Sequence, residues 1–421
     1  MSTDAPAARA HGRAAFAFIF VTVALDMLAI GVMAPVLPKL IIAFEGGDMA
    51  RAARITGFFG FTFAAMQFAF GSTIGTLSDR FGRRPVVLLS NFGLGLDYLL
   101  MAVAPSLGWL FCGRIVSGVT AASFPTAGAY IADVTPPEQR AARFGMLGAA
   151  FGLGFVIGPA VGGWLGDISL RLPFWVAAGL SLVNAAYGYF VLPESLPPER
   201  RRRGSWRAAN PLGALTLLRS HPALTSLAAA VALVYLANDS LPSLFVLYTD
   251  QRYGWTPHTV GLALAAVGIG STITSAVLVG PAVRRLGERR TLFLGLACGI
   301  TGLALMAAAR TGTLFLLGIP FTSLWGLAGP NIQSLMSRRV SPHEQGRLQG
   351  ALGSLRGLAG MLGPLLFTQL FALAVEGRWL PRLPGIPYWL AALLLATALL
   401  MARGATRPRP EEGPGRATSG A

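Results

Sequence analysis

Charged residues are scarce in this 421-residue chain. They make up 12% of it, whereas hydrophobic residues make up 53% and the mean hydropathy is +0.59. Soluble domains usually carry about 25% charged residues, so this chain lacks the polar surface that soluble domains of its length need. Apolar segments near the 20 or so residues that span a bilayer recur from one end to the other. The composition therefore predicts a multi-pass membrane protein.

Lysine, cysteine and histidine are also rare. Lys39 is the only lysine, so the net charge of +16 comes almost entirely from arginine. The arginines lie in short loops between apolar runs, which indicates control of membrane orientation rather than nucleic-acid binding. Cys112 and Cys298 lie in apolar segments and give neither a disulfide framework nor a metal-binding spacing. We expect no metal site and no cofactor.

The sequence also lacks the motifs of common enzymes. The run GLGFVIG (152–158) has neither the preceding strand nor the lysine of a phosphate-binding loop. No pattern of Ser, His and Asp suggests a catalytic triad, and an intramembrane enzyme is only a weak alternative. We therefore expect a protein that is not an enzyme and is not driven directly by ATP.

Apolar runs alternate with charged breaks along the chain, which predicts an all-α fold of twelve membrane spans. The expected spans are 14–37, 53–77, 86–104, 107–131, 144–166, 172–192, 222–247, 259–283, 290–309, 312–336, 348–374 and 386–402. The first run is too long for a cleaved signal and carries an acid, so we expect it to remain as a span. Most of the 34 Lys and Arg residues lie in the termini and alternate loops, which places both termini in the cytoplasm.

The organisation of the chain follows from these breaks. We expect a cytoplasmic tail (1–13), a first six-helix half (14–192), a Pro- and Arg-rich cytoplasmic linker (193–221), a second six-helix half (222–402) and a disordered cytoplasmic tail (403–421). Residues 75–90 align with 280–295, and 132–159 with 337–364, at one offset of 205. The two halves are therefore predicted to be parallel repeats, a pattern found in major facilitator transporters.

The charged turn GTLSDRFGRRPVVLLS (75–90) falls between spans 2 and 3. It resembles the signature loop of the major facilitator superfamily, G-x-L-x-D-R-x-G-R-[RK]. A glycine permits close helix approach, and Gly82 permits a positive φ in the turn. Asp79 is expected to pair with an arginine or to accept from a helix N-terminus. The resemblance implies a conformational gate, to which we assign Gly75, Asp79, Arg80, Gly82, Arg83, Arg84, Asp133 and Arg140.

The second half departs from this pattern. Arg284 stands where Asp79 stands, and Arg338 stands where Asp133 stands. The first half thus offers acids at its cytoplasmic rim and the second offers bases. Our hypothesis is that these groups help to hold the two halves together on the cytoplasmic side, so that a charge swap between Asp79 and its partner would restore lost transport.

The segment GLGFVIGPAVGG (152–163) in span 5 is rich in small residues, which pack membrane helices closely. It also resembles the superfamily's antiporter motif, G-x-x-x-G-P-x-x-G-G. The matching positions are Gly154, Gly158, Pro159, Gly162 and Gly163. The resemblance implies a drug–proton antiporter rather than a sugar symporter.

Further segments bring the likeness closer. They are TVALDMLAIGVMAPVLPKLI (22–41), GRIVSGVTAASFPTAGAYIAD (113–133), LPESL (192–196), RLGERR (285–290), GRLQGAL (346–352) and GPLLFT (363–368). With the two motifs, they resemble the tetracycline-resistance branch of these exporters over nearly the whole chain outside the tails. The resemblance implies a proton-driven exporter, with a divalent cation present only as part of the drug complex.

Ionisable residues inside the spans are the candidates for function. Asp26 and Asp97 lie about 16–18 Å into their spans at 1.5 Å per residue, near the midplane, and Arg114 enters span 4 at a compatible depth. All three match acid and arginine positions of the family, and we expect the acids to carry protons with Arg114 tuning them. A helix-packing hydrogen bond is the alternative for Asp26.

The second half is less regular. Cys298 stands where the tetracycline pumps carry a third intramembrane acid, and Ser271 and Ser275 stand where they carry His and Gln. Asp239, in the outer half of span 7, is a substitute acid or a solvated acid at the cavity mouth. Arg356 in span 11 is expected to face the cavity and attract an anionic group. Gln67, Asn331 and Gln333 add polar surface or bridge helices.

The sequence thus predicts a twelve-helix major facilitator protein of the bacterial cytoplasmic (inner) membrane. It would act as a monomer in the lipid bilayer and export a small amphipathic drug in exchange for protons, with a tetracycline-like antibiotic as the leading candidate. Two alternatives stay open: a transporter of a metabolite such as a sugar or amino acid, and a sensor or scaffold that does not transport.

Overall fold

The computed structural model describes residues 5–121, 123–201, 216–219, 222–377 and 384–406. The first half is built from helices that are long and mostly apolar. They are α1 (Ala5–Met33), α2 (Leu37–Phe44), α3 (Met49–Phe81), α4 (Arg83–Val103), α5 (Leu107–Thr120), α6 (Ser123–Val134), α7 (Pro137–Ile168) and α8 (Leu172–Val191), followed by the 3₁₀ turn η1 (Pro198–Arg200).

The second half begins with the short helix α9 (Thr216–Arg219). Its other elements are α10 (Pro222–Asn238), α11 (Ser240–Tyr253), α12 (Pro257–Ile273), the π-helical turn η4 (Thr274–Leu278), α13 (Val279–Ala308), α14 (Gly312–Leu316), α15 (Gly318–Leu324), the 3₁₀ turn η5 (Trp325–Leu327), α16 (Ala328–Ser337), the 3₁₀ turn η6 (Pro342–Glu344), α17 (Gln345–Glu376) and α18 (Ile386–Ala405).

These helices account for twelve membrane crossings. Among the residues that the structure describes, ten helical segments are long and apolar enough to span a bilayer by length and composition. One of them, Pro257–Ala308, has 52 residues and holds two crossings, because Gly287 interrupts it with non-helical backbone. The remaining crossing is made by α5 and α6 together, where Leu107–Thr120 alone is too short. The predicted all-α fold of twelve spans is confirmed.

The two halves share the same turn at corresponding places. Gly82 separates α3 from α4 with φ of 108°, and Gly287 interrupts α13 with φ of 78°. Both values lie in the left-handed region, which glycine adopts without the steric cost that a Cβ imposes. Since these glycines are the pair that the offset of 205 aligns, the repeated sequence pattern folds into a repeated turn.

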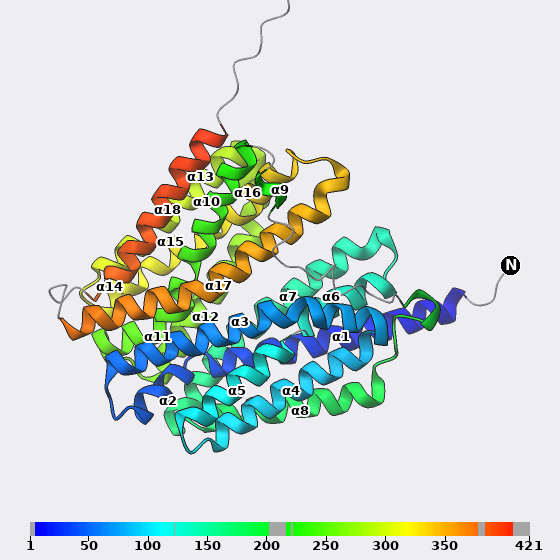
Figure 1. Ribbon diagram of the computed structural model, residues 1–421, viewed down its shortest axis with the longest axis horizontal. Helices are drawn as coiled ribbons and strands as arrows, with labels where there is room; N and C mark the ends of the chain where they lie inside the picture. Colours follow the sequence, from blue (N-terminus) through cyan, green and yellow to red (C-terminus); the bar gives the residue numbers. More distant parts are fainter. Residues whose placement is uncertain (1–4, 122, 202–215, 220–221, 378–383, 407–421) are drawn as a thin grey trace, which may run out of the picture.

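The halves are joined at one end of the molecule and diverge at the other. Figure 1 shows the bundles approaching near α2 and α11 and separating toward the far ends of α6 and α16. Helix α3 packs on α17, and α7 packs on α12. The buried core of the second half includes Met49, Ala50 and Ala53 of α3. The turn with Gly82 lies at the end where the halves diverge, which we call the signature-loop end.

Several element boundaries differ from the expected spans. Helix α1 begins at Ala5, earlier than residue 14, and α18 continues to Ala405, past residue 402. Span 7 is divided at Asp239 into α10 and α11, and span 10 is divided into α14, α15, η5 and α16. Most of the predicted linker (202–215 and 220–221) and of the C-terminal tail (407–421) lies outside the described residues.

Candidate functional site: buried charges beside a central cavity

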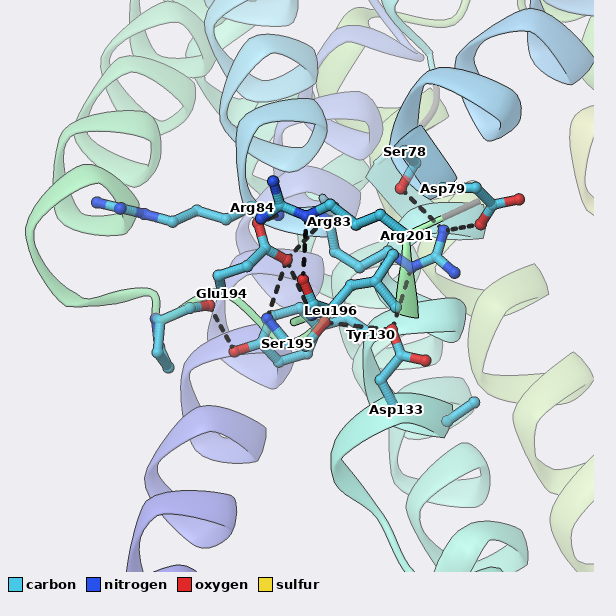
Figure 2. Close-up of polar contacts among 12 residues, drawn as sticks. Ser78, Asp79, Arg83, Arg84, Tyr130, Asp133, Glu194, Ser195, Leu196 and Arg201 are labelled. Carbon is cyan, nitrogen blue, oxygen red and sulfur yellow. Dashed lines mark hydrogen bonds and ion pairs between the residues drawn. The ribbon is translucent and has the colours of Figure 1, made fainter. Parts of the chain in front are cut away.

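The signature loop is anchored by Glu194, which follows α8. Its Oε1 accepts from the backbone N–H of Arg83 at 2.8 Å, and its Oε2 accepts from that of Arg84 at 3.3 Å (Figure 2). Both N–H groups lie at the N-terminus of α4, where no helical carbonyl can accept from them and where a negative charge is favoured. A Cβ at Gly82 would lie 2.1 Å from Glu194 Oε2, so glycine is required there by space as well as by φ.

Arg83 gathers the acids of the predicted gate. Its Nη1 lies 2.6 Å from Asp79 Oδ1, its Nε donates to Asp133 Oδ2 at 3.1 Å, and its Nη1 donates to Ser78 Oγ at 3.1 Å (Figure 2). The side chain therefore ties the end of α3 to the end of α6. Asp79 pairs with an arginine, as expected, whereas the helix N-terminus is occupied by Glu194.

The other predicted gate residues lie around this centre. Arg84 donates to Tyr189 O, and its guanidinium lies 5.8 Å from the Tyr189 ring centroid. Arg140 donates to Thr135 O at 3.1 Å and to Ala132 O at 2.9 Å, and so satisfies carbonyls at the end of α6. Arg80 is exposed beside Phe81, with its guanidinium 5.2 Å from that ring centroid.

Two expectations for this region are not met in the arrangement seen. A Cβ at Gly75 would meet nothing within 4 Å, so none of the described helices approaches it closely. The charges at the signature-loop end pair within their own halves: Arg338 lies 2.7 Å from Glu288 in the second half, as Arg83 lies beside Asp133 in the first. The physical reason is that the halves diverge at this end, which leaves pairing across them to a different arrangement.

The predicted antiporter motif of α7 serves two close helix contacts. On one face, Cβ atoms at Gly154, Gly158 and Gly162 would lie 2.5, 2.6 and 2.0 Å, respectively, from the nearest atoms of α1. The shortest of these distances is to Val32 O. On another face, a Cβ at Gly163 would lie 2.5 Å from Pro257 O of α12 in the other half. Pro159 lies inside α7. The motif therefore packs α7 against α1 and the second half at once.

Asp26 is buried among carboxamides. Its side chain is 1% exposed, and Asn184 Nδ2 donates to its Oδ1 at 3.2 Å. With the Asn91 amide turned to satisfy both neighbours, Asn91 donates to Asp26 Oδ2 at 3.0 Å and accepts from Asn184 at 3.1 Å. Asn184 also donates to Thr22 O at 3.1 Å. One acid thus links α1, α4 and α8 in the interior of the first half.

Asp97 and Arg114 form a separate buried ion pair. Arg114 Nη2 of α5 lies against Asp97 Oδ2 of α4, and the two side chains are 7% and 0% exposed. A Cβ at Gly113 would lie 2.4 Å from Asp97 Oδ1, so glycine makes room for this carboxylate. Arg114 also lies over the Phe63 ring. Arg114 was expected to tune both acids; it pairs directly with Asp97, and the carboxamides of Asn91 and Asn184 contact Asp26.

A cavity of about 540 Å³ lies between the halves, formed mainly by the second. Ile30, Met33, Ala34 and Phe155 line it from the first half. Arg356 and Ser271 are among the second-half residues in its wall, as the sequence led us to expect for Arg356. Asp26, Asp97, Arg114 and Asp239 do not contribute to the wall. Asp239 is half-buried between α10 and α11, against Gly363 of α17.

The remaining polar candidates make local contacts. Asn331 is buried and donates to Leu327 O at 2.7 Å within its own helical turn, and Gln333 donates to Gln349 at 2.8 Å between α16 and α17. Gln67 donates to Ala121 O at 3.5 Å. Cys298 is a free, partly buried thiol, and Ser275 lies in η4. In the part of the chain that the structure describes, no group of three His, Cys, Asp or Glu side chains could hold a metal ion.

Known proteins share this organisation. Residues 19–364 and 227–420 match the family described as Major Facilitator Superfamily. The chain belongs to the Major Facilitator Superfamily. It is 38% identical to the class C tetracycline resistance protein of Escherichia coli, covering 85% of this chain and 89% of that protein. It is 39% identical to the class G tetracycline resistance protein of Vibrio anguillarum, covering 85% and 90%.

The relationship extends to three-dimensional structure. A crystal structure of the nucleoside transporter NupG superposes with a TM-score of 0.75, covering 93% of this chain and all of that one at 13% identity, which establishes the shared fold. The tetracycline resistance proteins place the chain in the tetracycline efflux family of the superfamily, so it is a membrane transporter and not an enzyme.

Three residues of this superfamily member were missed by reasoning from the sequence. Asn91 and Asn184 are polar residues within apolar helices, as Asp26 is, and this pattern could have marked them as candidates. Glu194 is part of LPESL, which was quoted only for its likeness. Its place at the N-terminus of α4, more than 100 residues earlier in the chain, has no sequence signal.

Proposed function

We propose that this protein exports a small amphipathic drug in exchange for protons, by alternating access, with a tetracycline-like antibiotic as the leading substrate. The observation that carries the proposal is the pair of acids buried in the apolar interior, Asp26 and Asp97, in a fold whose two halves share a cavity. Charged groups are expensive inside a membrane and mark ion or proton pathways. The relatives named as tetracycline resistance proteins supply the substrate class.

The carboxylates of Asp97 and Asp26, the two candidate proton-binding groups, have different surroundings. Asp97 Oδ1 is buried with no hydrogen-bond partner among the described residues, while Oδ2 contacts Arg114. A proton bound at the open oxygen neutralises Asp97 and leaves the buried Arg114 guanidinium without its counter-charge, so proton binding weakens the ion pair between α4 and α5. Asp26 accepts hydrogen bonds from the neutral amides of Asn91 and Asn184, and a proton on its carboxylate removes the negative charge that these amides stabilise. We assign proton coupling to both acids.

The orientation belongs to the same proposal. With both termini in the cytoplasm of the inner membrane, as the arginine-rich loops favour, the signature-loop end faces inward. The arrangement described here is then an inward-facing state of a monomer, and the pairing of cytoplasmic charges across the halves belongs to the outward-facing state. A divalent cation enters only as part of the drug complex.

Efflux from cells expressing the protein tests this function. Accumulation of tetracycline and of a small panel of other antibiotics is measured with and without a protonophore, for the wild type, Asp26→Asn and Asp48→Asn. Asp48 caps α3 by accepting from the Arg51 N–H at 3.0 Å, and asparagine caps equally well, so this variant controls for loss of an acid.

We expect protonophore-sensitive export of tetracycline that is lost in Asp26→Asn and retained in Asp48→Asn. Export of another drug but not tetracycline would mean that Ser271, Ser275 and Cys298 change the substrate. If correctly inserted protein exports no drug, the proposal fails and transport of a metabolite becomes the better account.

A further inference from the structure

Helices α10 and α17 of the second half pack against each other beside the cavity. Gly363 of α17 is the contact point: a Cβ there would lie 2.5 Å from Asp239 Cβ and 2.9 Å from Asp239 Oδ2. Arg356 lies seven residues, or about two turns, before Gly363 and so on the same face of α17. Tyr235 lies one turn before Asp239 on α10. The Arg356 guanidinium is 5.5 Å from the Tyr235 ring centroid.

Neither Asp239 nor Arg356 forms an ion pair with another described residue. Among the described residues, the Asp239 carboxylate makes no hydrogen bond or ion pair and does not cap α11. The Arg356 side chain is exposed in the cavity wall and makes no ion pair with any described acid. The two side chains interact electrostatically, beyond ion-pair distance. This arrangement differs from Arg54, Arg83, Arg114 and Arg338, each of which contacts a carboxylate.

The cavity wall around Arg356 is mostly apolar. Aromatic and aliphatic side chains dominate it, with a few hydroxyl and amide groups; the wall includes Phe155, Phe245, Leu241, Leu264, Trp325 and Asn238. A guanidinium exposed in such a cavity within the membrane requires a counter-ion. A ligand that fits the wall has an aromatic body for the apolar residues and one anionic group for Arg356.

We propose that this cavity binds aromatic anions through Arg356, and that Asp239 is the internal counter-ion that competes with the bound anion for the same guanidinium. The Tyr235 ring holds the guanidinium at the cavity surface by a cation–π contact. The close approach at Gly363 holds Asp239 near enough to act but too far to form the pair directly. This proposal rests on the proposed export function and names the substrate class of its cavity.

Binding to the purified, detergent-solubilised protein tests the proposal with matched probes. The probes are radiolabelled 1-naphthoate and its methyl ester, which share one ring system and differ in charge. They are measured on the wild type, Arg356→Gln, Arg356→Lys, Asp239→Asn and the control Arg347→Gln. Arg347 is an exposed arginine on the same helix, outside the cavity wall, so the control removes one positive charge from α17 elsewhere.

We expect the wild type and Arg347→Gln to bind naphthoate at least about tenfold more tightly than its ester, as a charge-assisted contact provides. Arg356→Gln should lose that preference, and Arg356→Lys should keep part of it. Asp239→Asn should bind naphthoate more tightly than the wild type, because the competing charge is gone. This last result does not depend on the stability of the arginine variants.

Equal binding of acid and ester by the wild type, including no binding of either, would overturn the proposal. So would a preference that survives in Arg356→Gln, or weaker naphthoate binding in Asp239→Asn. Failure of drug export in cells has a separate meaning, since it would remove the proposed function while leaving the measured anion preference in place.

Discussion

Lys39 of α2 forms an ion pair with Asp250 of α11, and also donates to the backbone carbonyl of Trp255. The only lysine of the chain thus joins the two halves at the end opposite the signature loop. Other polar contacts also cross the halves at this end: Arg54 lies 2.6 Å from Glu376, and Asp167 accepts from the His258 N–H at 3.1 Å and from Thr256 Oγ1 at 3.3 Å. These contacts hold the two halves together at the end opposite the signature loop, which we call the closed end.

Lys39→Gln should therefore favour the arrangement that is open at this end. A partly buried pair that loses one partner leaves the other charge uncompensated, which weakens the closed state. Spin labels attached at positions 108 and 313, in a background without Cys112 and Cys298, report the distance between the halves. We expect a larger population of long distances in Lys39→Gln, and its reversal in the swap Lys39→Asp with Asp250→Lys.

Arg51→Gln is the control for this experiment. Arg51 lies near the same end but pairs at 3.8 Å with Glu45 and Asp48 of its own half. Its loss should leave the distance distribution unchanged. An equal shift in both variants would show that charge at this end matters in general and that the pair does not hold the halves.

Gly162→Ala should disrupt the contact between α7 and α1. A Cβ there would lie 2.0 Å from Val32 O, and backbone atoms cannot move aside as a flexible side chain can. We expect a loss of about 1–3 kcal/mol in stability, read as a lower melting temperature in detergent. Gly148→Ala in the same helix has nothing within 4 Å and should melt as the wild type does. Equal melting of the two variants would refute the packing role.

Arg114→Gln should cost more stability than removal of the whole ion pair. It leaves the fully buried Asp97 carboxylate uncompensated, at a cost of about 3–5 kcal/mol. The double variant Asp97→Asn with Arg114→Gln removes both charges and should recover part of the melting temperature. Additive losses in the double variant would mean that the two side chains act independently.

Glu194→Ala should loosen the start of α4. It removes the acceptor for the Arg83 and Arg84 N–H groups, a change comparable to the loss of a helix cap at about 1 kcal/mol. Hydrogen–deuterium exchange of the peptide at 82–90 should become faster. Glu199→Ala removes an exposed acid nearby in the chain and should leave that exchange unchanged. Unchanged exchange in Glu194→Ala would exclude the anchoring role.

Local spacing explains which parts of this structure were predictable. The signature loop was recognised because its glycines and charges lie within ten residues, and Gly82 adopts the positive φ that its place in the turn implied. The burial of Asp97 and Arg114 followed from polar residues at matching depths in apolar helices, and the structure pairs them. The helical repeat itself was visible as one offset between the halves.

Contacts between distant segments were not predictable in the same way. Whether Asp26 faces Arg114 or Asn184 depends on the rotation of α1 about its axis, which packing at Gly158 and Gly162 sets. The division of span 7 at Asp239 does have a local signal, because Pro242 in the first turn of α11 has no N–H to continue the helix back to Asn238. Pairing within rather than across the halves depends on the conformational state, and one sequence encodes more than one state.

Proton movement during drug transport is the most direct test of drug–proton exchange by this protein. Purified protein is reconstituted into liposomes that enclose a pH-sensitive dye, and tetracycline with Mg²⁺ is added outside without a pH gradient. We expect inward drug movement to drive protons out, so that the lumen becomes more alkaline, and we expect no such change with Asp26→Asn or in protein-free liposomes. Drug uptake by the wild-type protein without any change in lumenal pH would contradict it.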